Sequence, residues 1–372
     1  MAFQQCSLEN VGLRMSDQFW QGKRVFITGH TGFKGSWLSL WLQNMGAILK
    51  GFSLEPPTQP SLFIEANVAV GMTSQIGDIR DYQTLFESID TFKPEIVLHL
   101  AAQPLVRLSY DIPIDTYATN VMGTVHLLEA CRKVQGIKAI VNITSDKCYE
   151  NQEWLWGYRE NEPMGGYDPY SNSKGCAELV TASFRQSFFN PKNHQQHGVG
   201  LASVRAGNVI GGGDWALDRL IPDILLAFQE GRPVEIRSPH AIRPWQHVLE
   251  PLSGYLNVAE QLYLKGENYS EAWNFGPDDK DARPVQYIVD ALAKSWGEDA
   301  QWFLSKGEHP HEANYLKLDC TKAKMRLHWQ PKWNLETTLH KIVAWHQAWL
   351  RKDDMHEYTL NEIQNYMNQG QA

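Results

Sequence analysis

The sequence predicts an α/β protein with a doubly wound parallel sheet and a smaller C-terminal lobe. A short β-branched and aromatic run at 24–28 ends at a glycine-rich turn and is followed by helical apolar spacing at 36–42. Further short apolar runs recur between helical segments as far as residue 205, and after it short elements alternate with prolines. Strands that alternate with helices are typical of a parallel sheet covered on both faces. We therefore predict a Rossmann-type sheet and a lobe that binds the substrate.

The composition is ordinary for a globular protein and shows no surplus of basic residues. The chain has 372 residues, 43% of them hydrophobic and 20% charged, with a formal net charge of -8. General nucleic-acid binding is not expected, because few cations are available to neutralise phosphates, although local arginine pockets for a small phosphorylated ligand remain compatible. No apolar run approaches the ~20 residues of a membrane span. Residues 1–17 lack the order of a signal peptide, and we expect them to form an N-terminal tail.

Cysteine usage favours a reducing compartment. The chain has five cysteines, namely Cys6, Cys131, Cys148, Cys176 and Cys320. Their number is odd and they lack the paired spacing that is typical of metal ligands. We therefore expect free thiols, a cytoplasmic location and no metal site.

The glycine-rich turn predicts a dinucleotide site. Gly29, Gly32 and Gly35 lie between the strand at 24–28 and the helix at 36–42. Glycines in this context allow backbone N–H groups and the helix N-terminus to approach a pyrophosphate. The residues expected to contact the cofactor here are Gly29, His30, Gly32, Phe33 and Gly35. Two interpretations of the His30 side chain remain open, contact with the cofactor or exposure to solvent.

The second predicted strand, at 46–52, lacks the acid that usually binds the adenosine ribose. Ser53 follows the strand, and Glu55 comes later, before two prolines. The missing acid leaves the choice between NAD and NADP open, although no arginine stands where a 2′-phosphate would require one. We hypothesise that NAD is bound less tightly than in proteins with the acid in place, so that dialysis should remove it.

The next predicted strands bring further residues to the cofactor. They lie at 74–77, 95–103, 138–144 and 199–205. Asp78 and Ile79 follow the first of these and are expected to bracket the adenine ring. Ala101 and Ala102 end the second, where small residues let the backbone pass close to a ligand.

A tyrosine and a lysine four residues apart, Tyr170 and Lys174, lie in a predicted helix. At this spacing both side chains leave the same helix face, so the ammonium can favour the ionised phenol and make it a useful base. The pair alone occurs by chance on many helices. Ser145, Asp146 and Lys147 lie at the carboxyl end of the strand at 138–144, which is where open parallel sheets bind their ligands.

These residues suggest a chemistry on a sugar bound above the nicotinamide. Tyr170 would take the C4 hydroxyl proton as hydride leaves C4, Lys174 would hold the cofactor ribose, and Ser145 would hydrogen-bond the same oxygen. Asp146, with a pKa raised by burial, would protonate the departing C6 hydroxyl. Lys147 would be either the base at C5 or a fixed cation that stabilises the enolate. A solvated turn with a weak ion pair is the alternative for Asp146 and Lys147.

The substrate diphosphate would need cations. Candidate ligands are Arg205, Arg219, Arg243 and Asn208, although an ordinary surface role suits Arg219 equally well. We expect the NAD-binding domain to comprise 18–204, with 244–277 returning to it. The lobe would comprise 205–243 and 278–372, including an amphipathic helix near 335–350 and a peripheral helix in the last twenty residues.

Several motifs together resemble a known family. They are GHTGFKG at 29–35, SLEPPT at 53–58, TSDKCY at 144–149, YSNSK at 170–174, RAGNVIGGGD at 205–214 and RPWQHV at 243–248. The chain resembles the extended short-chain dehydrogenase/reductases, and among them the nucleotide-sugar 4,6-dehydratases that act on CDP-glucose. The glycine loop and the Tyr/Lys pair indicate only the superfamily, whereas Asp146, Lys147 and the tryptophan-flanked loops indicate the dehydratases.

The resemblance implies a cytoplasmic homodimer that uses NAD. It would convert CDP-glucose into CDP-4-dehydro-6-deoxyglucose, for the deoxysugars of lipopolysaccharide O-antigen. Related dTDP-sugar dehydratases carry Glu where Lys147 stands, so the C5 base does not transfer from them. The preference for cytosine is implied by the resemblance alone.

Two other functions compete with this hypothesis. A nucleotide-sugar 4-epimerase needs the Tyr/Lys pair but no acid and base at C5 and C6. A dinucleotide-sensing regulatory protein would keep the glycine loop without turnover, and such a protein has no reason to keep Ser145, Tyr170 and Lys174 together.

Overall fold

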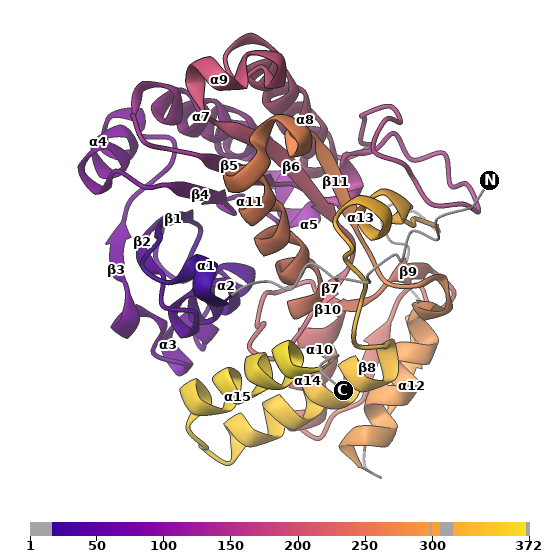
Figure 1. Ribbon diagram of the computed structural model, residues 1–372. Coiled ribbons are helices and arrows are strands. Elements are labelled where there is room, and N and C mark those ends of the chain that lie inside the picture. The colour runs from indigo at the N-terminus through magenta and orange to yellow at the C-terminus, as the bar shows by residue number, and fades with distance from the viewer. Residues whose placement is uncertain (1–16, 298–299, 306–314, 370–372) are drawn as a thin grey trace, which may run out of the picture.

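A seven-stranded parallel sheet forms the centre of the molecule (Figure 1). The computed structural model describes residues 17–297, 300–305 and 315–369. The strand order is β11-β6-β5-β4-β1-β2-β3, so the chain reverses direction across the sheet between β1 and β4. The strands are β1 (Arg24–Thr28), β2 (Ile48–Ser53), β3 (Thr73–Ile76), β4 (Ile96–His99), β5 (Ala139–Ile143), β6 (Gly200–Ala206) and β11 (Ala272–Phe275). This topology confirms the predicted Rossmann-type fold.

Alternation along the buried strands sends side chains to two cores, one on each face. Phe26 lies in one apolar cluster with residues of the outer helices, whereas Val25 and Ile27 lie in the other. Both kinds of position are buried because helices cover both faces of a parallel sheet. The helices that bound these cores are α2 (Phe33–Asn44), α4 (Tyr82–Phe92), α7 (Gly123–Lys133), α8 (Pro169–Ser187) and α11 (Leu249–Tyr269).

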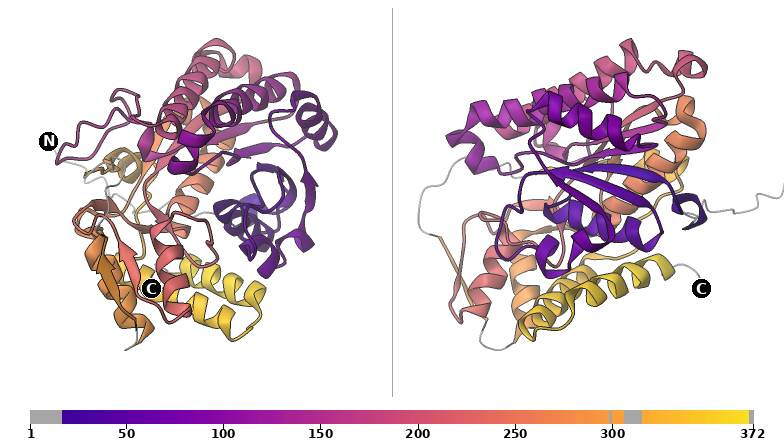
Figure 2. Two further views of the ribbon diagram at one scale, coloured as in Figure 1. Left: turned by 180° about the vertical axis from the view of Figure 1, so that it is seen from behind. Right: turned by 90° about the vertical axis from the view of Figure 1, so that its left-hand side faces the viewer.

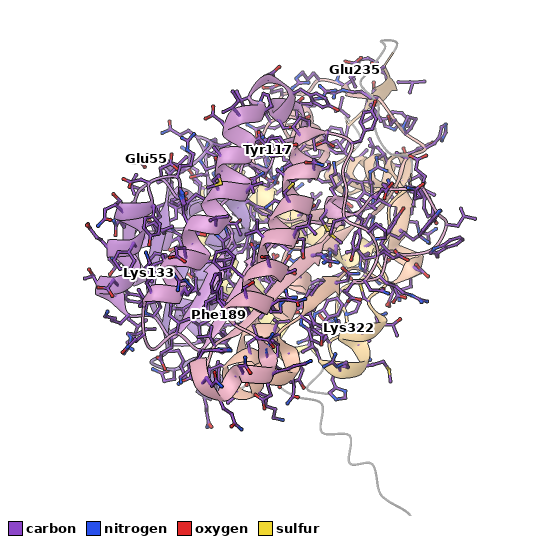
Figure 3. The ribbon with its side chains drawn as sticks, turned by 90° about the horizontal axis from the view of Figure 1, so that it is seen from above. Glu55, Tyr117, Lys133, Phe189, Glu235 and Lys322 are labelled. Carbon is purple, nitrogen blue, oxygen red and sulfur yellow. The ribbon has the colours of Figure 1, made fainter. Side chains whose placement is uncertain are left out.

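Figure 2 shows the layer containing α7 and α8 on one side of the sheet and the yellow C-terminal helices on the other. Figure 3 looks onto the outer layer, where Tyr117 and Phe189 lie towards opposite ends. Shorter helices join these elements: α1 (Asp17–Trp20), α3 (Leu62–Glu65), α5 (Val106–Asp111), α6 (Pro113–Tyr117), a π-helical turn (Ala118–Met122) and α9 (His194–His197). Short 3-10 turns lie at Val68–Gly71, Asp146–Cys148, Pro191–Asn193 and Asp279–Asp281.

The C-terminal lobe consists of small sheets and helices around its own apolar cluster. The parallel pairs are β7 (Val209–Ile210) with β10 (Gln246–His247), and β8 (Val234–Ile236) with β13 (Trp302–Leu304). β9 (Ile242–Pro244) pairs antiparallel with β12 (Ala282–Pro284). The helices that contribute to this cluster are α10 (Leu220–Gln229), α12 (Val285–Trp296) and α14 (Leu335–Leu350), whereas the buried residues of α13 (Thr321–Arg326) and α15 (Met355–Asn368) belong to the core that includes the sheet.

The C-terminal helix α15 packs against the sheet domain. Its Tyr366 is fully buried and meets Trp41 of α2 edge to face, with ring centroids 5.6 Å apart. The Tyr366 hydroxyl donates to Glu250 of α11 over 2.7 Å. The helix expected in the last twenty residues is therefore present, but the expectation that it is peripheral is wrong, because one face of α15 carries buried side chains.

Two further predictions concern features that the structure describes only in part. Cys131, Cys148, Cys176 and Cys320 are free thiols, and Cys6 lies outside the described residues. The tail predicted for 1–17 also lies almost wholly outside them. In the described ranges, no helix combines the length and apolarity needed to cross a bilayer.

Candidate active site

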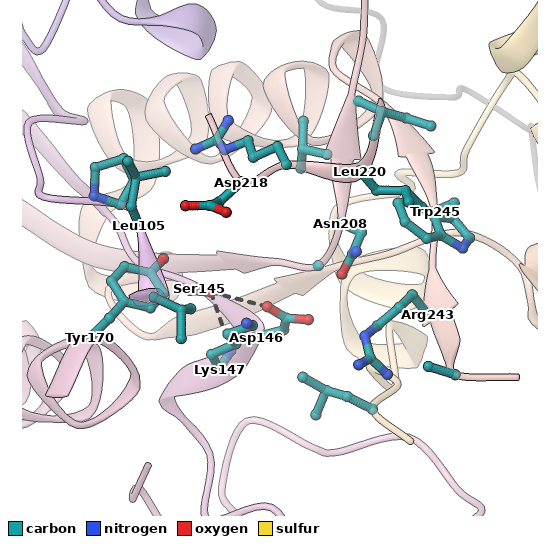
Figure 4. Close-up of a pocket in the computed structure, with 18 of the residues that line it drawn as sticks. Leu105, Ser145, Asp146, Lys147, Tyr170, Asn208, Asp218, Leu220, Arg243 and Trp245 are labelled. Carbon is teal, nitrogen blue, oxygen red and sulfur yellow. Dashed lines mark hydrogen bonds between the residues drawn. The ribbon is translucent and has the colours of Figure 1, made fainter. Parts of the chain in front are cut away.

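A cleft of about 510 Å³ opens where the carboxyl ends of β5 and β6 face the lobe. Figure 4 shows Ser145, Asp146, Lys147 and Tyr170 at one side and Arg243 and Trp245 across from them. The sheet domain thus contributes the predicted chemical groups and the lobe contributes a cation. This is the position at which doubly wound sheets bind their ligands.

A tight turn after β5 positions the acid. Ser145 caps the 3-10 turn, because its hydroxyl accepts a hydrogen bond from the backbone N–H of Lys147 over 3.2 Å. The same hydroxyl donates to Oδ1 of Asp146 over 3.0 Å. These bonds fix the orientation of the carboxyl group relative to the cleft.

Asp146 has the environment that a general acid needs. The residue is only 3% exposed, and its Oδ2 has no hydrogen-bond partner among the described residues. Burial raises the pKa of this carboxyl group, while the cations Lys147, Lys34 and Arg243 and the bond from Ser145 oppose the shift. A raised pKa lets a carboxyl group keep its proton to a higher pH, which suits a group that delivers a proton to a leaving hydroxyl. The solvated turn considered as its alternative is wrong for Asp146.

Tyr170 is held at the start of α8. Asp168 caps this helix, and the backbone N–H of Tyr170 donates to Oγ of Ser109 over 3.1 Å. Burial raises the pKa of the phenol to about 12. A hydrogen bond with Ser145 and the charge of Arg219 act in the opposite direction and lower this pKa. The phenol therefore lies beside Ser145 in the cleft, as the sequence predicts for a C4 hydroxyl site.

Lys174 lies one helical turn after Tyr170, and the helical spacing brings both residues to the buried side of α8. Its Nζ lies 3.5 Å from the carbonyl oxygen of Ile143, and burial lowers the pKa of this ammonium to about 8. Stabilisation of the Tyr170 phenolate by Lys174 stays a prediction.

The four candidate diphosphate ligands separate into two groups. Arg219, Arg243 and Asn208 line the cleft. Arg219 pairs with Asp214 at 2.9 Å, and Arg243 donates to the carbonyl oxygen of Ile242 over 3.0 Å. All three therefore lie where the sequence predicts ligands for a diphosphate.

Arg205 is a structural residue, so its assignment as a diphosphate clamp is wrong. It is 3% exposed and pairs with Glu178 of α8 at 2.8 Å. Its NH1 donates to the hydroxyl of Tyr149 over 2.6 Å. Arg205 holds the pKa of Glu178 at about 2, although burial acts in the opposite direction. The sequence could not show this pairing, because only the register of β6 against α8 decides which face Arg205 takes.

The glycine loop fits the pyrophosphate of NAD. Gly29 has a φ of +76° and lies against the Ala101 backbone, and a Cβ added to Gly35 would lie 2.1 Å from the Gly29 carbonyl oxygen. A Cβ on Gly32 would meet nothing closer than 3.4 Å. The packing of the protein itself therefore requires glycine at the first and third positions. The second glycine leaves space at the α2 N-terminus in which a pyrophosphate can approach the protein backbone.

The His30 side chain does not face solvent, whereas its contact with the cofactor stays a prediction. Its ring is fully buried beneath the loop, its Nε2 lies 2.7 Å from Oγ of Ser74, and it fills the space left by Gly51 of β2. Burial lowers the pKa of His30 to about 4. The prediction of solvent exposure is therefore wrong, and the buried ring packs under the loop. The next residue, Thr31, hydrogen-bonds through its hydroxyl to the Ser53 hydroxyl at 2.8 Å.

The remaining predicted cofactor ligands lie near the same edge of the sheet. Ala101 follows β4, and its N–H donates to Oγ1 of Thr28 over 3.2 Å. Ala102 comes next and is half-buried. Asp78 pairs with Arg80 at 2.6 Å, and the Ile79 side chain is buried in the apolar core. Phe33 begins α2 and is half-buried. These placements are compatible with a cofactor along β1 to β4.

Sequence reasoning missed Lys34. This lysine lies in the first turn of α2 and lines the cleft. Burial lowers its pKa to about 7, the nearby cations Arg219 and Lys174 lower it further, and Asp146 and Asp214 oppose them. Its position between the second and third glycines was visible in the motif, but only the fold shows that it faces the acid.

The sheet, the glycine loop and the Tyr170/Lys174 helix define an extended short-chain dehydrogenase/reductase. A family profile described as GDP-mannose 4,6 dehydratase matches residues 26–342. A Salmonella typhimurium protein described as CDP-glucose 4,6-dehydratase is 67% identical over 349 residues, which cover 94% of this chain and 97% of that protein. The chain therefore belongs to this family of nucleotide-sugar 4,6-dehydratases.

More distant relatives share the architecture. A Haemophilus influenzae protein described as dTDP-glucose 4,6-dehydratase is 25% identical over 87% of this chain and 97% of its own length. The structure of dTDP-glucose 4,6-dehydratase from Bacillus anthracis in complex with NAD superposes with a TM-score of 0.73 at 21% identity, covering 89% of this chain and 99% of that one. A UDP-glucose 4-epimerase from Thermotoga maritima reaches 0.75 at 22% identity, with 88% and 99% covered. These two structures confirm the fold.

Proposed function

We propose that this chain is an NAD-dependent hydro-lyase that converts CDP-glucose into CDP-4-dehydro-6-deoxyglucose and water. The observation that carries the proposal is the buried carboxyl group of Asp146, which lies in one cleft with Tyr170 and Lys147. Redox chemistry at C4 alone does not require an acid at C6. The 67% identical relative described as CDP-glucose 4,6-dehydratase supports both the reaction and the cytidine donor.

The residues of the cleft divide the proton transfers. Tyr170 takes the proton of the C4 hydroxyl, and Ser145 holds the same oxygen. When bound, NAD supplies the acceptor for the C4 hydride and the donor for C6. Once C4 is a ketone, the C5 proton becomes acidic, and Asp146 gives its proton to the C6 hydroxyl, which leaves as water. Lys147 acts at C5 either as the base or as the cation that stabilises the enolate.

The lobe binds the rest of the substrate. Arg219 and Arg243 provide guanidinium groups for the diphosphate, and Asn208 provides an amide. The division of labour follows the chain: the sheet domain (18–204 with 244–277) holds NAD, and the lobe (205–243 and 278–372) holds the nucleotide sugar.

NAD is held by the glycine loop and is bound loosely. The contacts proposed are with Gly29, the His30 backbone, Gly32, Phe33 and Gly35, and with Asp78, Ile79, Ala101, Ala102, Tyr170 and Lys174. Ser53 stands where an acid would bind both ribose hydroxyls, so one anchor is missing. Extensive dialysis should remove the cofactor, and added NAD should restore activity. Protein that keeps stoichiometric NAD would contradict loose binding.

The enzyme is cytoplasmic and homodimeric, and it supplies deoxysugars for lipopolysaccharide O-antigen. Large apolar side chains are exposed on the helices of one face, among them Tyr110, Ile114, Met122, Leu179 and Phe188. Among these, Ile114 is 84% exposed, which favours a second subunit packed on this face. Sedimentation of the wild type and of Ile114→Asp tests the dimer: a monomeric wild type would overturn it.

The decisive experiment for the reaction is NMR of the C6 protons in deuterated water, with NAD and CDP-, UDP- or dTDP-glucose. A new 6-methyl signal with solvent deuterium at C5, strongest with CDP-glucose, is expected, because oxidation, elimination and internal hydride return produce it together. Unchanged C6 with inverted C4 would identify a 4-epimerase, the alternative enzyme. No turnover of any donor would favour a dinucleotide-sensing protein.

A further inference from the structure

The cleft has a second end that the proposed chemistry does not use. Ser145, Asp146 and Tyr170 lie at the end formed by the sheet, and Arg219 lies close enough to affect the pKa of Tyr170. At the other end the lining comes from the lobe and combines the apolar Leu220, Val234, Ile236 and Trp245 with the charged Asp218, Glu235 and Arg237. A sugar at Tyr170 and a diphosphate at the arginines leave this end for the nucleobase, which rests on the proposed function.

Helix α10 directs one carboxylate towards that end. Ile221, Ile224, Leu225 and Phe228 of this helix are buried in the core of the lobe. Arg219 is the N-cap residue of this helix and Asp223 lies in its first turn, about one turn or ~5.4 Å along the helix axis, and both line the cleft.

Asp223 differs from the neighbouring cleft carboxylates Asp214 and Asp218 in having no hydrogen-bond or ion-pair partner among the described residues. Asp214 pairs with Arg219 at 2.9 Å, and Asp218 pairs with Arg107 at 3.1 Å and with Arg237 at 3.7 Å. No hydrogen bond or ion pair to the half-buried Asp223 side chain occurs within the described ranges. An unpaired carboxylate beside a diphosphate site is unfavourable unless the ligand itself brings a donor.

We propose that Asp223 selects cytosine by accepting a hydrogen bond from its 4-amino group. Cytosine presents an N–H donor at this position, whereas thymine, and uracil with it, presents the O4 acceptor. An ionised carboxylate has acceptors only, so it would leave O4 unpaired and repelled. Asp223 is thus a specificity residue of the proposed reaction.

The surroundings of Asp223 make the selection depend on pH. Burial and the neighbouring charges of Asp218 and Asp214 raise the pKa of Asp223 to about 6, whereas Arg107 and Arg232 oppose the shift. Below that pKa the carboxyl group is neutral and can donate to O4. The preference for CDP-glucose over UDP-glucose should therefore decrease as the pH falls below about 6. Other titrating groups that affect both substrates equally do not change the ratio of the two kcat/KM values.

The test compares kcat/KM for CDP-glucose and UDP-glucose in the wild type, Asp223→Asn and Glu230→Gln. An Asn amide can accept from cytosine and donate to O4, so the ratio should fall at least about tenfold in Asp223→Asn, mainly through KM. Glu230→Gln removes a carboxylate at the end of the same helix, outside the cleft, and should keep the wild-type ratio. Calorimetry with CDP and UDP should show the same change without turnover.

The outcomes separate this proposal from the proposed function. If Asp223→Asn lowers kcat/KM equally for both substrates, or leaves their ratio unchanged, the role of Asp223 in selecting cytosine is overturned. Such a result would indicate a contact with the ribose or a structural role instead. A wild type that converts no nucleotide sugar would overturn the function itself. If Asp223→Asn fails to fold, the pH dependence of the wild-type ratio decides, because a ratio that is constant from about pH 5 to about pH 7 contradicts the proposal.

Discussion

At the residue scale, the site depends on side chains whose ionisation is set by burial. The pKa of Asp146 is raised, that of Tyr170 is raised to about 12, and that of Lys174 is lowered to about 8, and burial is the largest cause in each case. Burial always disfavours the charged form, so each group is biased towards neutrality before any ligand binds. The substrate and the cofactor must therefore supply the interactions that allow Tyr170 to release its proton.

Asp146→Asn tests the acid. The amide keeps the hydrogen bond with Ser145 but cannot protonate the C6 oxygen, so product formation should fall roughly 10²-fold or more. Oxidation at C4 needs no such proton, and reduced nicotinamide should accumulate after CDP-glucose is added. Absorbance of the cofactor and NMR of the product measure the two steps. Asp353→Asn, an exposed residue outside the cleft, is the control, and normal dehydration by Asp146→Asn would refute the assignment.

His30 should make the fold sensitive to acid. Its pKa is lowered from 6.5 to about 4. Between these two pH values His30 is therefore mostly protonated in the unfolded chain and mostly neutral in the folded chain. The sign is therefore a loss of stability on acidification. Between about pH 7 and pH 5, the wild type should lose about 2 kcal/mol more unfolding free energy than His30→Gln.

Denaturant titrations at the two pH values measure this difference. The exposed His340 of α14 provides the control. Between the same two pH values, His340→Gln should lose as much unfolding free energy as the wild type. An equal pH dependence in His30→Gln and the wild type would show that the His30 ring titrates normally and is not buried as described.

At the scale of single elements, the turn from β1 into α2 is the most constrained part of the cofactor site. Three glycines occur at equal spacing, yet the structure gives them different roles. A Cβ on Gly35 would lie 2.1 Å from the Gly29 carbonyl oxygen, whereas one on Gly32 would have only the same oxygen at 3.4 Å. The regular motif therefore combines a packing requirement with a requirement for ligand access.

Gly35→Ala and Gly32→Ala should separate the two requirements. Gly35→Ala forces the turn open and should destabilise the protein by about 1–3 kcal/mol, with loss of NAD binding. Gly32→Ala should leave the melting temperature nearly unchanged and weaken NAD binding at least about tenfold, because the methyl group would occupy the approach to the pyrophosphate. Calorimetry with NAD and thermal melting measure both, and equal melting temperatures for the two variants would contradict the distinction.

At the scale of the whole molecule, the C-terminal helix α15 joins the sheet domain to the segment before α14. Glu250 at the start of α11 accepts hydrogen bonds from the backbone N–H of Trp333 over 2.7 Å and from the Tyr366 hydroxyl over 2.7 Å. An oxygen of the Glu362 carboxylate lies 3.0 Å from Nε2 of His247 in the same buried region. Helix α15 also packs on α2, so the chain terminus supports the element that begins the cofactor site.

Tyr366→Phe tests this connection. The variant keeps the ring contact with Trp41 but leaves Glu250 with one donor fewer, so the unfolding free energy should fall by about 1–2 kcal/mol. Tyr358→Phe on the same helix is the matched control, because the Tyr358 hydroxyl has no hydrogen bond among the described residues. Denaturant unfolding measures both variants, and an equal effect would mean that the bond to Glu250 contributes nothing to stability.

The sequence by itself determined the sheet, the glycine loop and the catalytic turn. The strand 24–28 and the helix Leu335–Leu350 agree with the prediction to the residue, and the other sheet strands agree within a few residues. These features depend on local patterns: alternation, helical spacing and glycine at tight turns. Asp146 and Tyr170 also follow from local patterns, because Asp146 lies at the carboxyl end of β5 and Tyr170 lies four residues before Lys174 in α8.

Only the tertiary structure decided which charges face the cleft. Arg205 pairs with Glu178 inside the fold, His30 is buried behind the loop, and Lys34 faces Asp146. Asp223 lacks the partner that Asp214 and Asp218 have. No local pattern carries this information, since the partner of a charged side chain comes from an element distant in the sequence, and the register and packing of that element select the pair.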